Sequence, residues 1–222
     1  MFLSLNGNSK KGIPLNKVVT SASGYAEIHR LRENIVNLLL REKQKTIMVT
    51  SPHDYAGNTF LVSVLGFNIA YFSKMKVLLV DMNMRNPQLH IPFDLKLEHG
   101  FSEVASGFLN VKDIIKDTSL PGLKVITGGK PDSELSRFLK RSFLDNLVTE
   151  FKRYFDLILF DTSPVLVQNR NNVDPTFLSL ICDKVVIVVQ GKKTTRSELE
   201  NAVSAIPQGR AKISGLVYNH QF

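Results

Sequence analysis

The sequence contains a single cysteine, Cys182, among its 222 residues. One thiol excludes an internal disulfide framework and a cysteine-rich metal site. No apolar run reaches the roughly 18–20 residues that a membrane-spanning helix needs. The first five residues lack both the basic segment and the long apolar core of a signal peptide. These absences together predict a cytoplasmic protein.

Acidic residues are also in short supply, with 20 Asp and Glu against 28 Lys and Arg, for a net charge of +8. The basic residues form only short, scattered clusters, and neither a zinc-finger spacing nor an aromatic-glycine RNA motif is present. We therefore expect no nucleic-acid partner. The charge leaves three interpretations open: a solvated basic surface, an anionic membrane surface, or an acidic partner protein.

What the chain does have is a series of short apolar runs without alternation, which is typical of strands buried on both faces of a parallel sheet. Residues 1–20 are polar and without clear periodicity, so they are predicted to be a flexible arm, and residues 21–222 a single domain. The predicted strands cover residues 46–50, 77–80, 123–127, 157–160, 184–189 and 213–218.

Helical periodicity separates these runs. The predicted helices cover residues 24–40, 60–73, 100–106, 111–115, 133–154 (one helix or two) and 195–206, and the part from 60 to 71 is predicted to be amphipathic. Strands that alternate with helices indicate an α/β fold, a doubly wound and mostly parallel sheet flanked by helices. Ligands of such folds bind where the strands end.

The first predicted strand runs into a loop that has the layout of a phosphate-binding P-loop. Gly57 and Thr59 stand where that motif has glycine and Ser/Thr, but its lysine position holds Asn58. The Thr59 hydroxyl is suited to Mg²⁺, whereas asparagine offers a hydrogen bond without charge. A plain strand-to-helix turn is the alternative for this loop taken alone.

Two further strand ends carry carboxylates, Asp81 and Asp161. A carboxylate after a buried strand needs a cation or a hydrogen-bonding partner. The sequence therefore predicts a magnesium site built from Thr59, Asp81 and Asp161. For Asp81 the alternative is a helix cap or an ion pair with Arg85.

The order of these motifs resembles the cytoplasmic ATPase domain of the bacterial tyrosine kinases (BY-kinases), which belong to the MinD/ParA group of P-loop ATPases. The resemblance covers roughly residues 24–220. It rests on the Walker A′-like residues 77–87, the Walker B-like residues 156–165, the segments 122–129 and 131–135, and the closing strand 215–219. It implies ATP or ADP with Mg²⁺ as cofactors, a nucleotide site that includes Gly57, Asn58, Thr59 and Asn219, and Asp81 as a catalytic candidate.

The sequence departs from this family where phosphate chemistry is performed. Asn58 replaces the P-loop lysine, Asp54 and Tyr55 replace a small Pro-Gly pair, and Asn83 replaces the second Walker A′ aspartate. None of the five tyrosines lies beyond Tyr218, so we expect no autophosphorylation of a C-terminal tyrosine cluster. The changes predict that nucleotide binding is weak or lost and that Asp81 is vestigial.

The resemblance then implies a degenerate regulatory or binding subunit of capsule or exopolysaccharide biosynthesis and export. Its expected partner is the cytoplasmic part of a membrane chain-length regulator, which would hold it at the inner face of the membrane, with a homo-oligomer or a paralogous kinase as further partners. One alternative is an active ATPase or tyrosine kinase that uses a substitute lysine such as Lys10, Lys11 or Lys130. Another is a MinD/ParA-type positioning ATPase.

Overall fold

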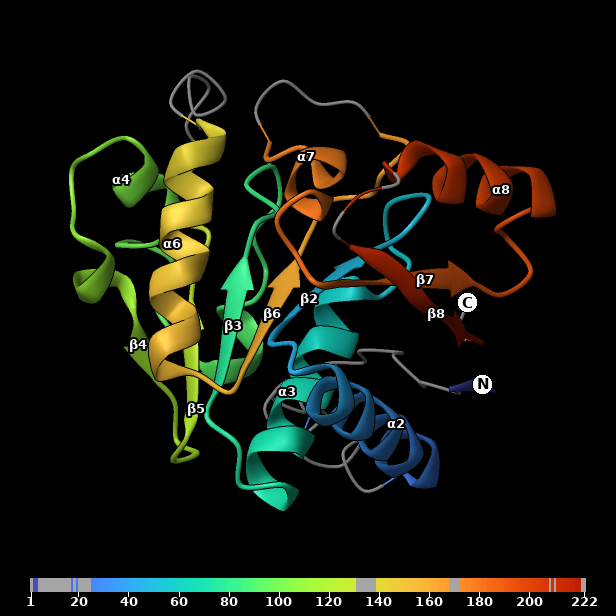
Figure 1. Cartoon of the computed structure of the whole chain (residues 1–222), viewed down its shortest axis with the longest axis horizontal. Helices are drawn as coiled ribbons and strands as arrows, with labels where there is room; N and C mark the ends of the chain where they lie inside the picture. The colour runs from blue at the N-terminus through green and yellow to red at the C-terminus, as the bar shows by residue number, and fades with distance from the viewer. Residues whose placement is uncertain are drawn as a thin grey trace.

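The fold is seen in a computed structural model, which describes residues 2–3, 17, 19, 25–130, 139–167, 172–207, 209 and 211–220. Most of the predicted arm, including Lys10 and Lys11, lies outside the described residues. Within them, eight strands form one sheet in the order β1-β8-β7-β2-β6-β3-β5-β4, in which only β4 is antiparallel to its neighbour. The prediction of a mostly parallel α/β sheet is therefore confirmed (Figure 1).

The strands are β1 (Phe2–Leu3), β2 (Thr46–Thr50), β3 (Val77–Asp81), β4 (Lys116–Asp117), β5 (Leu123–Ile126), β6 (Leu157–Asp161), β7 (Lys184–Gln190) and β8 (Lys212–Asn219). Six of them were predicted to within two residues at each end. The short edge strands β1 and β4 were not predicted, since two residues carry no periodic signal. β1 pairs in parallel with the end of β8, so this small part of the arm adds to the sheet.

The helices are α2 (Ala26–Glu42), α3 (Asn58–Phe72), α4 (Phe101–Ala105), α6 (Arg141–Tyr154), α7 (Pro175–Ser179) and α8 (Arg196–Ala205), and the 3₁₀ helices are η1 (Ile91–Phe93) and η2 (Val111–Ile114). The first half of the predicted helix at 133–154 falls largely outside the described residues. The α7 helix was missed although its start has a readable signal. Asp174 caps it by accepting from Thr176 N, and Pro175 occupies its first turn.

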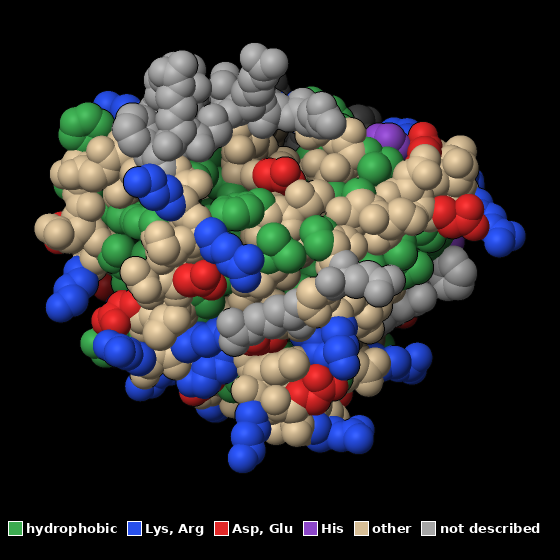
Figure 2. Space-filling view, turned by 45° about the horizontal axis from the view of Figure 1, so that its top comes forward, with side chains coloured by type: hydrophobic (Ala, Val, Ile, Leu, Met, Phe, Trp, Pro, Cys, Tyr) green, Lys and Arg blue, Asp and Glu red, His purple; other side chains and the backbone are tan. Residues whose placement is uncertain are grey.

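Two apolar cores lie on opposite faces of the sheet. Alternate residues of one strand divide between them: Ile47 and Val49 face α2 and α3, whereas Met48 faces the side covered by α4, α6 and α7. None of the described helices is both long and apolar enough to cross a bilayer. On the face seen in Figure 2, Lys and Arg side chains are interspersed with Asp and Glu rather than massed in one stripe.

The prediction that the helix after the P-loop is amphipathic is wrong. The α3 helix is apolar on almost all sides, and nine of its residues between Leu61 and Ala70 are buried. It packs against the sheet on one side and is covered by α2 on the other (Figure 1). A helix that is packed between two layers has no face toward solvent, so its sequence has no need of a polar stripe.

Candidate functional site

The predicted site residues come from four strand ends that the sheet order brings together. β6 lies between β2 and β3, and Asp81 and Asp161 are direct partners in the β3–β6 register. Thr59, in the first turn of α3, donates from its hydroxyl to Asp161 Oδ2 at 2.6 Å. The three predicted magnesium ligands are therefore brought to one edge of the sheet.

The P-loop itself is held by the last strand of the sheet. Asn219, at the end of β8, donates from Nδ2 to the carbonyl oxygen of Ala56 at 2.8 Å. Gly57 adopts φ +98°, and a Cβ placed on it would lie 2.7 Å from that same Nδ2. The loop thus needs glycine both for its backbone angle and for the close approach of Asn219.

Replacing Gly57 with alanine should destabilise the protein by about 2–3 kcal/mol, because backbone strain is added to the displacement of Asn219. Chemical denaturation measures the change. Gly107→Ala is the matched control, because Gly107 has φ +78° with no atom within 4 Å of an added Cβ. The control should lose only about 1 kcal/mol. Equal losses in both variants would show that the Asn219 contact contributes nothing.

Asn58 is fixed within the loop rather than directed at a ligand. Its Nδ2 donates to Ser51 Oγ at 3.1 Å and to the carbonyl oxygen of Thr162 at 3.2 Å. Both amide hydrogens are therefore used, and the remaining polar atom, Oδ1, is buried without a hydrogen-bond partner. An amide oxygen is an acceptor and would repel the oxygens of a phosphate group.

The two carboxylates are buried, and within the described part of the chain no positive side chain lowers the pKa of either one. Burial raises the pKa of the Asp81 carboxyl to about 7, although the backbone N–H groups of Leu89 and Asn83 donate to its two oxygens. Burial and the neighbouring Asp81 charge raise the pKa of Asp161 well above its usual value. The Asp161 Oδ1 atom is buried and has no hydrogen-bond partner.

These features fit a divalent cation. Mg²⁺ takes oxygen ligands, and a cation beside Asp161 Oδ1 and the Thr59 hydroxyl would offset the buried negative charge. Asp81 would contribute mainly by charge, since each of its oxygens already accepts a backbone N–H. The described residues contain no group of three or more His, Cys, Asp or Glu side chains that could hold a metal ion, so such a site depends on two carboxylates and a hydroxyl.

A cavity of about 780 Å³ opens beside the loop, a size suited to a cofactor. Its walls include the predicted residues Gly57, Asn58 and Thr59. They also include residues that the sequence interpretation did not place there: Asp54, Arg85, Gln88, Gln190 and Lys193. Lys130, a candidate substitute lysine, is absent from the lining, and its backbone N–H donates to Glu103.

The predicted alternative of an Asp81–Arg85 ion pair is wrong. Arg85 instead pairs with Asp54 of the P-loop, 31 residues earlier in the chain. The sequence signal that could have suggested this pair is the charge of Asp54 at a position where the resembling family has a small residue. Asn172, which holds the loop after β3 by accepting from Met84 N at 2.8 Å, had no signal in the sequence.

A strand, a glycine loop and a helix, with carboxylates at neighbouring strand ends, define the P-loop nucleotide-binding fold. Comparison with solved structures agrees. The kinase domain of Escherichia coli tyrosine kinase ETK matches with a TM-score of 0.83 and 26% identity over 94% of this chain and 80% of that one. Pyrococcus horikoshii MinD, complexed with Mg-ADP, matches with a TM-score of 0.65 and 18% identity over 78% and 68%.

Sequence relatives give the more specific result. The tyrosine-protein kinase ptk of Acinetobacter johnsonii is 28% identical over 95% of this chain, which spans only 28% of that protein. The putative tyrosine-protein kinase CapB of Staphylococcus aureus is 27% identical over 85% of this chain and 81% of its own length. No protein-family model matches the chain. The chain is a homologue of proteins named tyrosine-protein kinase, and its structural neighbours are BY-kinase domains and MinD-type ATPases.

Proposed function

We propose that the chain is a degenerate BY-kinase-like domain that binds Mg-nucleotide weakly or not at all and performs no autophosphorylation. In this proposal it serves capsule or exopolysaccharide biosynthesis and export as a regulatory or binding subunit. Its partner is the cytoplasmic part of a membrane chain-length regulator, which places it at the inner face of the membrane. The net charge of +8 favours approach to an anionic leaflet.

The observation that carries the proposal is the bonding of Asn58. Stabilising positive charge is the main source of catalysis in phosphoryl transfer, and removing one such group typically lowers the rate by about 10²- to 10³-fold. Here the residue at the lysine position has no charge, and both of its donors are bonded to Ser51 and Thr162. The side chain at position 58 therefore has neither a positive charge nor an unused donor with which to contact a phosphate.

The biological role is supported by the relatives. They include the Staphylococcus aureus protein named CapB and the Streptococcus agalactiae protein named CpsD, both described as tyrosine-protein kinases. A chimeric protein named CapA2B2 has the same fold, with a TM-score of 0.73. A chain of this fold with a disabled loop is suited to regulating or binding a partner rather than to phosphorylating one.

Titration with fluorescent ADP and ATP, with and without Mg²⁺, tests the proposal. We expect a dissociation constant of about 100 µM or weaker, because charge-assisted phosphate contacts worth roughly 1.5–3 kcal/mol are missing. We expect no phosphate release above background. Micromolar affinity with turnover that disappears in Asp81→Ala and Asp161→Ala would contradict the proposal and establish an enzyme.

One observation favours the active alternative. Lys193, in the loop between β7 and α8, lines the same cavity as Asn58. A lysine on this wall would be the substitute for the missing charge in an active enzyme, in place of Lys130. If the wild-type protein hydrolyses ATP, loss of that turnover in Lys193→Met but not in Lys192→Met would identify the substitute.

A further inference from the structure

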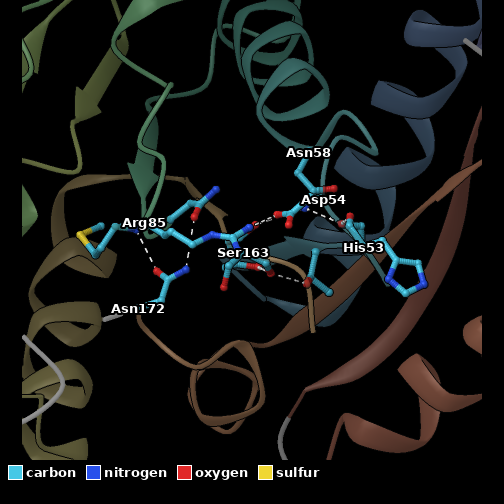
Figure 3. A network of polar contacts seen from close by, with 11 residues as sticks. His53, Asp54, Asn58, Arg85, Ser163 and Asn172 are labelled. Carbon is cyan, nitrogen blue, oxygen red and sulfur yellow. Dashed lines mark hydrogen bonds and ion pairs between the residues drawn. The ribbon is translucent and has the colours of Figure 1, made fainter. Parts of the chain in front are cut away.

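The cavity contains an internal ion pair that links two of its walls. The Asp54 side chain comes from the P-loop and the Arg85 side chain from the segment after β3. Each is about one-third exposed, at 35% and 34%. Figure 3 shows the Arg85 side chain extended across the site toward Asp54, on the same side as Asn58. The guanidinium therefore lies where the cavity meets the phosphate-binding loop.

The backbone next to Arg85 is anchored on two sides. Asn172, which is 6% exposed, accepts from Met84 N at 2.8 Å and donates to Asn83 Oδ1 at 3.2 Å. The N–H of Asn83 donates to Asp81 Oδ1 at 3.1 Å. In Figure 3 the Asn172 side chain lies below the Arg85 label, and two dashed lines mark its hydrogen bonds. Because the loop is fixed, the direction in which Arg85 leaves it is set before any ligand arrives, and less entropy is lost when it binds one.

The lining of the cavity includes two cations, Arg85 and Lys193, and Arg85 is the one that pairs with a residue of the P-loop, which makes it the better placed phosphate ligand. Asn58 offers only an acceptor, and Asp54 adds a negative charge to the loop. A guanidinium has five donors in a planar fork that matches phosphate oxygens, and it stays charged at all relevant pH values. An ion pair this exposed is weak, so an anion of higher charge can displace one carboxylate from it.

We propose that Arg85 is the phosphate-binding cation of this cavity, taking the part that position 58 no longer plays, and that Asp54 is its internal competitor. A nucleoside diphosphate or triphosphate then binds by displacing the Asp54 carboxylate from the Arg85 guanidinium. This inference rests on the proposed function, since it explains how residual nucleotide binding is achieved and why it is weak. The proposal assigns the affinity for nucleotide to Arg85 and Asp54 rather than to the residue at position 58.

A double-mutant cycle on the full chain tests the proposal with fluorescent ADP as the probe. Asp54→Asn should tighten binding about 5- to 20-fold, a gain of roughly 1–2 kcal/mol. Arg85→Gln should weaken binding at least tenfold, and Arg85→Lys should restore part of it. In the Asp54→Asn/Arg85→Gln variant the gain should vanish, because Asp54 acts through Arg85.

The controls use an ion pair away from the cavity. Arg141 and Asp145 on α6 pair at 3.5 Å, and Arg141→Gln and Asp145→Asn make the same changes in net charge. Neither should change the affinity for ADP beyond about twofold. Adenosine, which carries no phosphate, should bind Asp54→Asn and wild type equally. Thermal unfolding of each variant checks that it is folded.

Three results would overturn the proposal: a gain from Asp54→Asn that persists without Arg85, an equal gain for adenosine, and no measurable ADP binding in Asp54→Asn. The first would mean that Asp54 only repels phosphate. ATP turnover by the wild-type protein would instead contradict the proposed function. The double-mutant cycle would still test the roles of Arg85 and Asp54, because it measures only the affinity for ADP.

Discussion

Asn58→Lys should bind Mg-ADP about 10- to 100-fold more tightly than the wild-type protein. An ammonium group at this position would reach the phosphates, and hydrogen bonds to charged groups contribute roughly 1.5–3 kcal/mol, with about 1.4 kcal/mol per tenfold change. The substitution also releases Ser51 Oγ and the Thr162 carbonyl oxygen from the Asn58 amide. Fluorescence titration with ADP in the presence of Mg²⁺ measures the change.

Asn58→Met separates charge from the loss of those two hydrogen bonds. Methionine has nearly the length of lysine and breaks the same contacts without adding charge. We expect Asn58→Met to bind ADP no better than wild type. If Asn58→Met gained as much as Asn58→Lys, the increase would come from freeing the loop, and the missing charge would not be what limits the affinity for ADP.

Asp161→Asn should stabilise the protein by about 2–4 kcal/mol at pH 8, because it removes a carboxyl whose ionised form is disfavoured by burial and by the neighbouring Asp81 charge. The asparagine oxygen can still accept from the Thr59 hydroxyl, which now donates to Asp161 Oδ2. The same change should abolish any stabilisation of the fold by Mg²⁺. Thermal and chemical denaturation with and without Mg²⁺ measure both effects. A variant less stable than wild type at pH 8 would contradict this account.

The pH dependence follows from the same two carboxylates. The pKa of Asp81 is about 7 in the folded protein, against 3.8 for an unperturbed aspartate. Between these two pH values the folded protein keeps a proton that the unfolded chain has already lost. The free energy of unfolding should therefore fall as pH rises from about 4 to 7, by up to roughly 1.4 kcal/mol per pH unit, and then level off. Asp161 titrates in the same direction.

Comparison of variants isolates this contribution. The stability difference between Asp161→Asn and wild type should be largest at pH 8 and shrink as the pH falls, because the raised pKa values of both wild-type carboxyls disfavour the folded state less at lower pH. His90, whose pKa is lowered by burial, titrates in both proteins and cancels in the difference. Asp145→Asn, at an exposed ion pair, should differ from wild type by less than about 0.5 kcal/mol at every pH.

Local patterns predicted the strands well because four of the six predicted ones, β2, β3, β6 and β7, are buried at every residue. All five residues of β2 are buried, and its predicted limits, Thr46 and Thr50, are those observed. An apolar run that ends in a polar residue marks where a buried strand reaches the edge of the sheet. Asp81 and Asp161 stand at such ends, so a carboxylate site could be predicted before the order of the strands was known.

The start and surroundings of α3 could not be predicted in the same way. The helix begins at Asn58, directly after Gly57, which adopts a positive φ and lies against Asn219. Its burial on nearly all sides depends on α2 lying over it, a contact between segments that the sequence does not show to be neighbours. The periodicity of a sequence describes one helix at a time and does not show how many layers of the fold pack around that helix.

Four features could be read from the chain before its fold was known: the α/β class, the P-loop layout, the asparagine at the lysine position of that layout and the two acidic strand ends. Two others are visible in the folded molecule alone: the Asn58 amide donates to Ser51 and Thr162, and Arg85 pairs with Asp54 rather than with Asp81. The physical reason is the strand order. With β6 between β2 and β3, groups from distant parts of the chain meet at one edge, and no local pattern encodes which of them will bond.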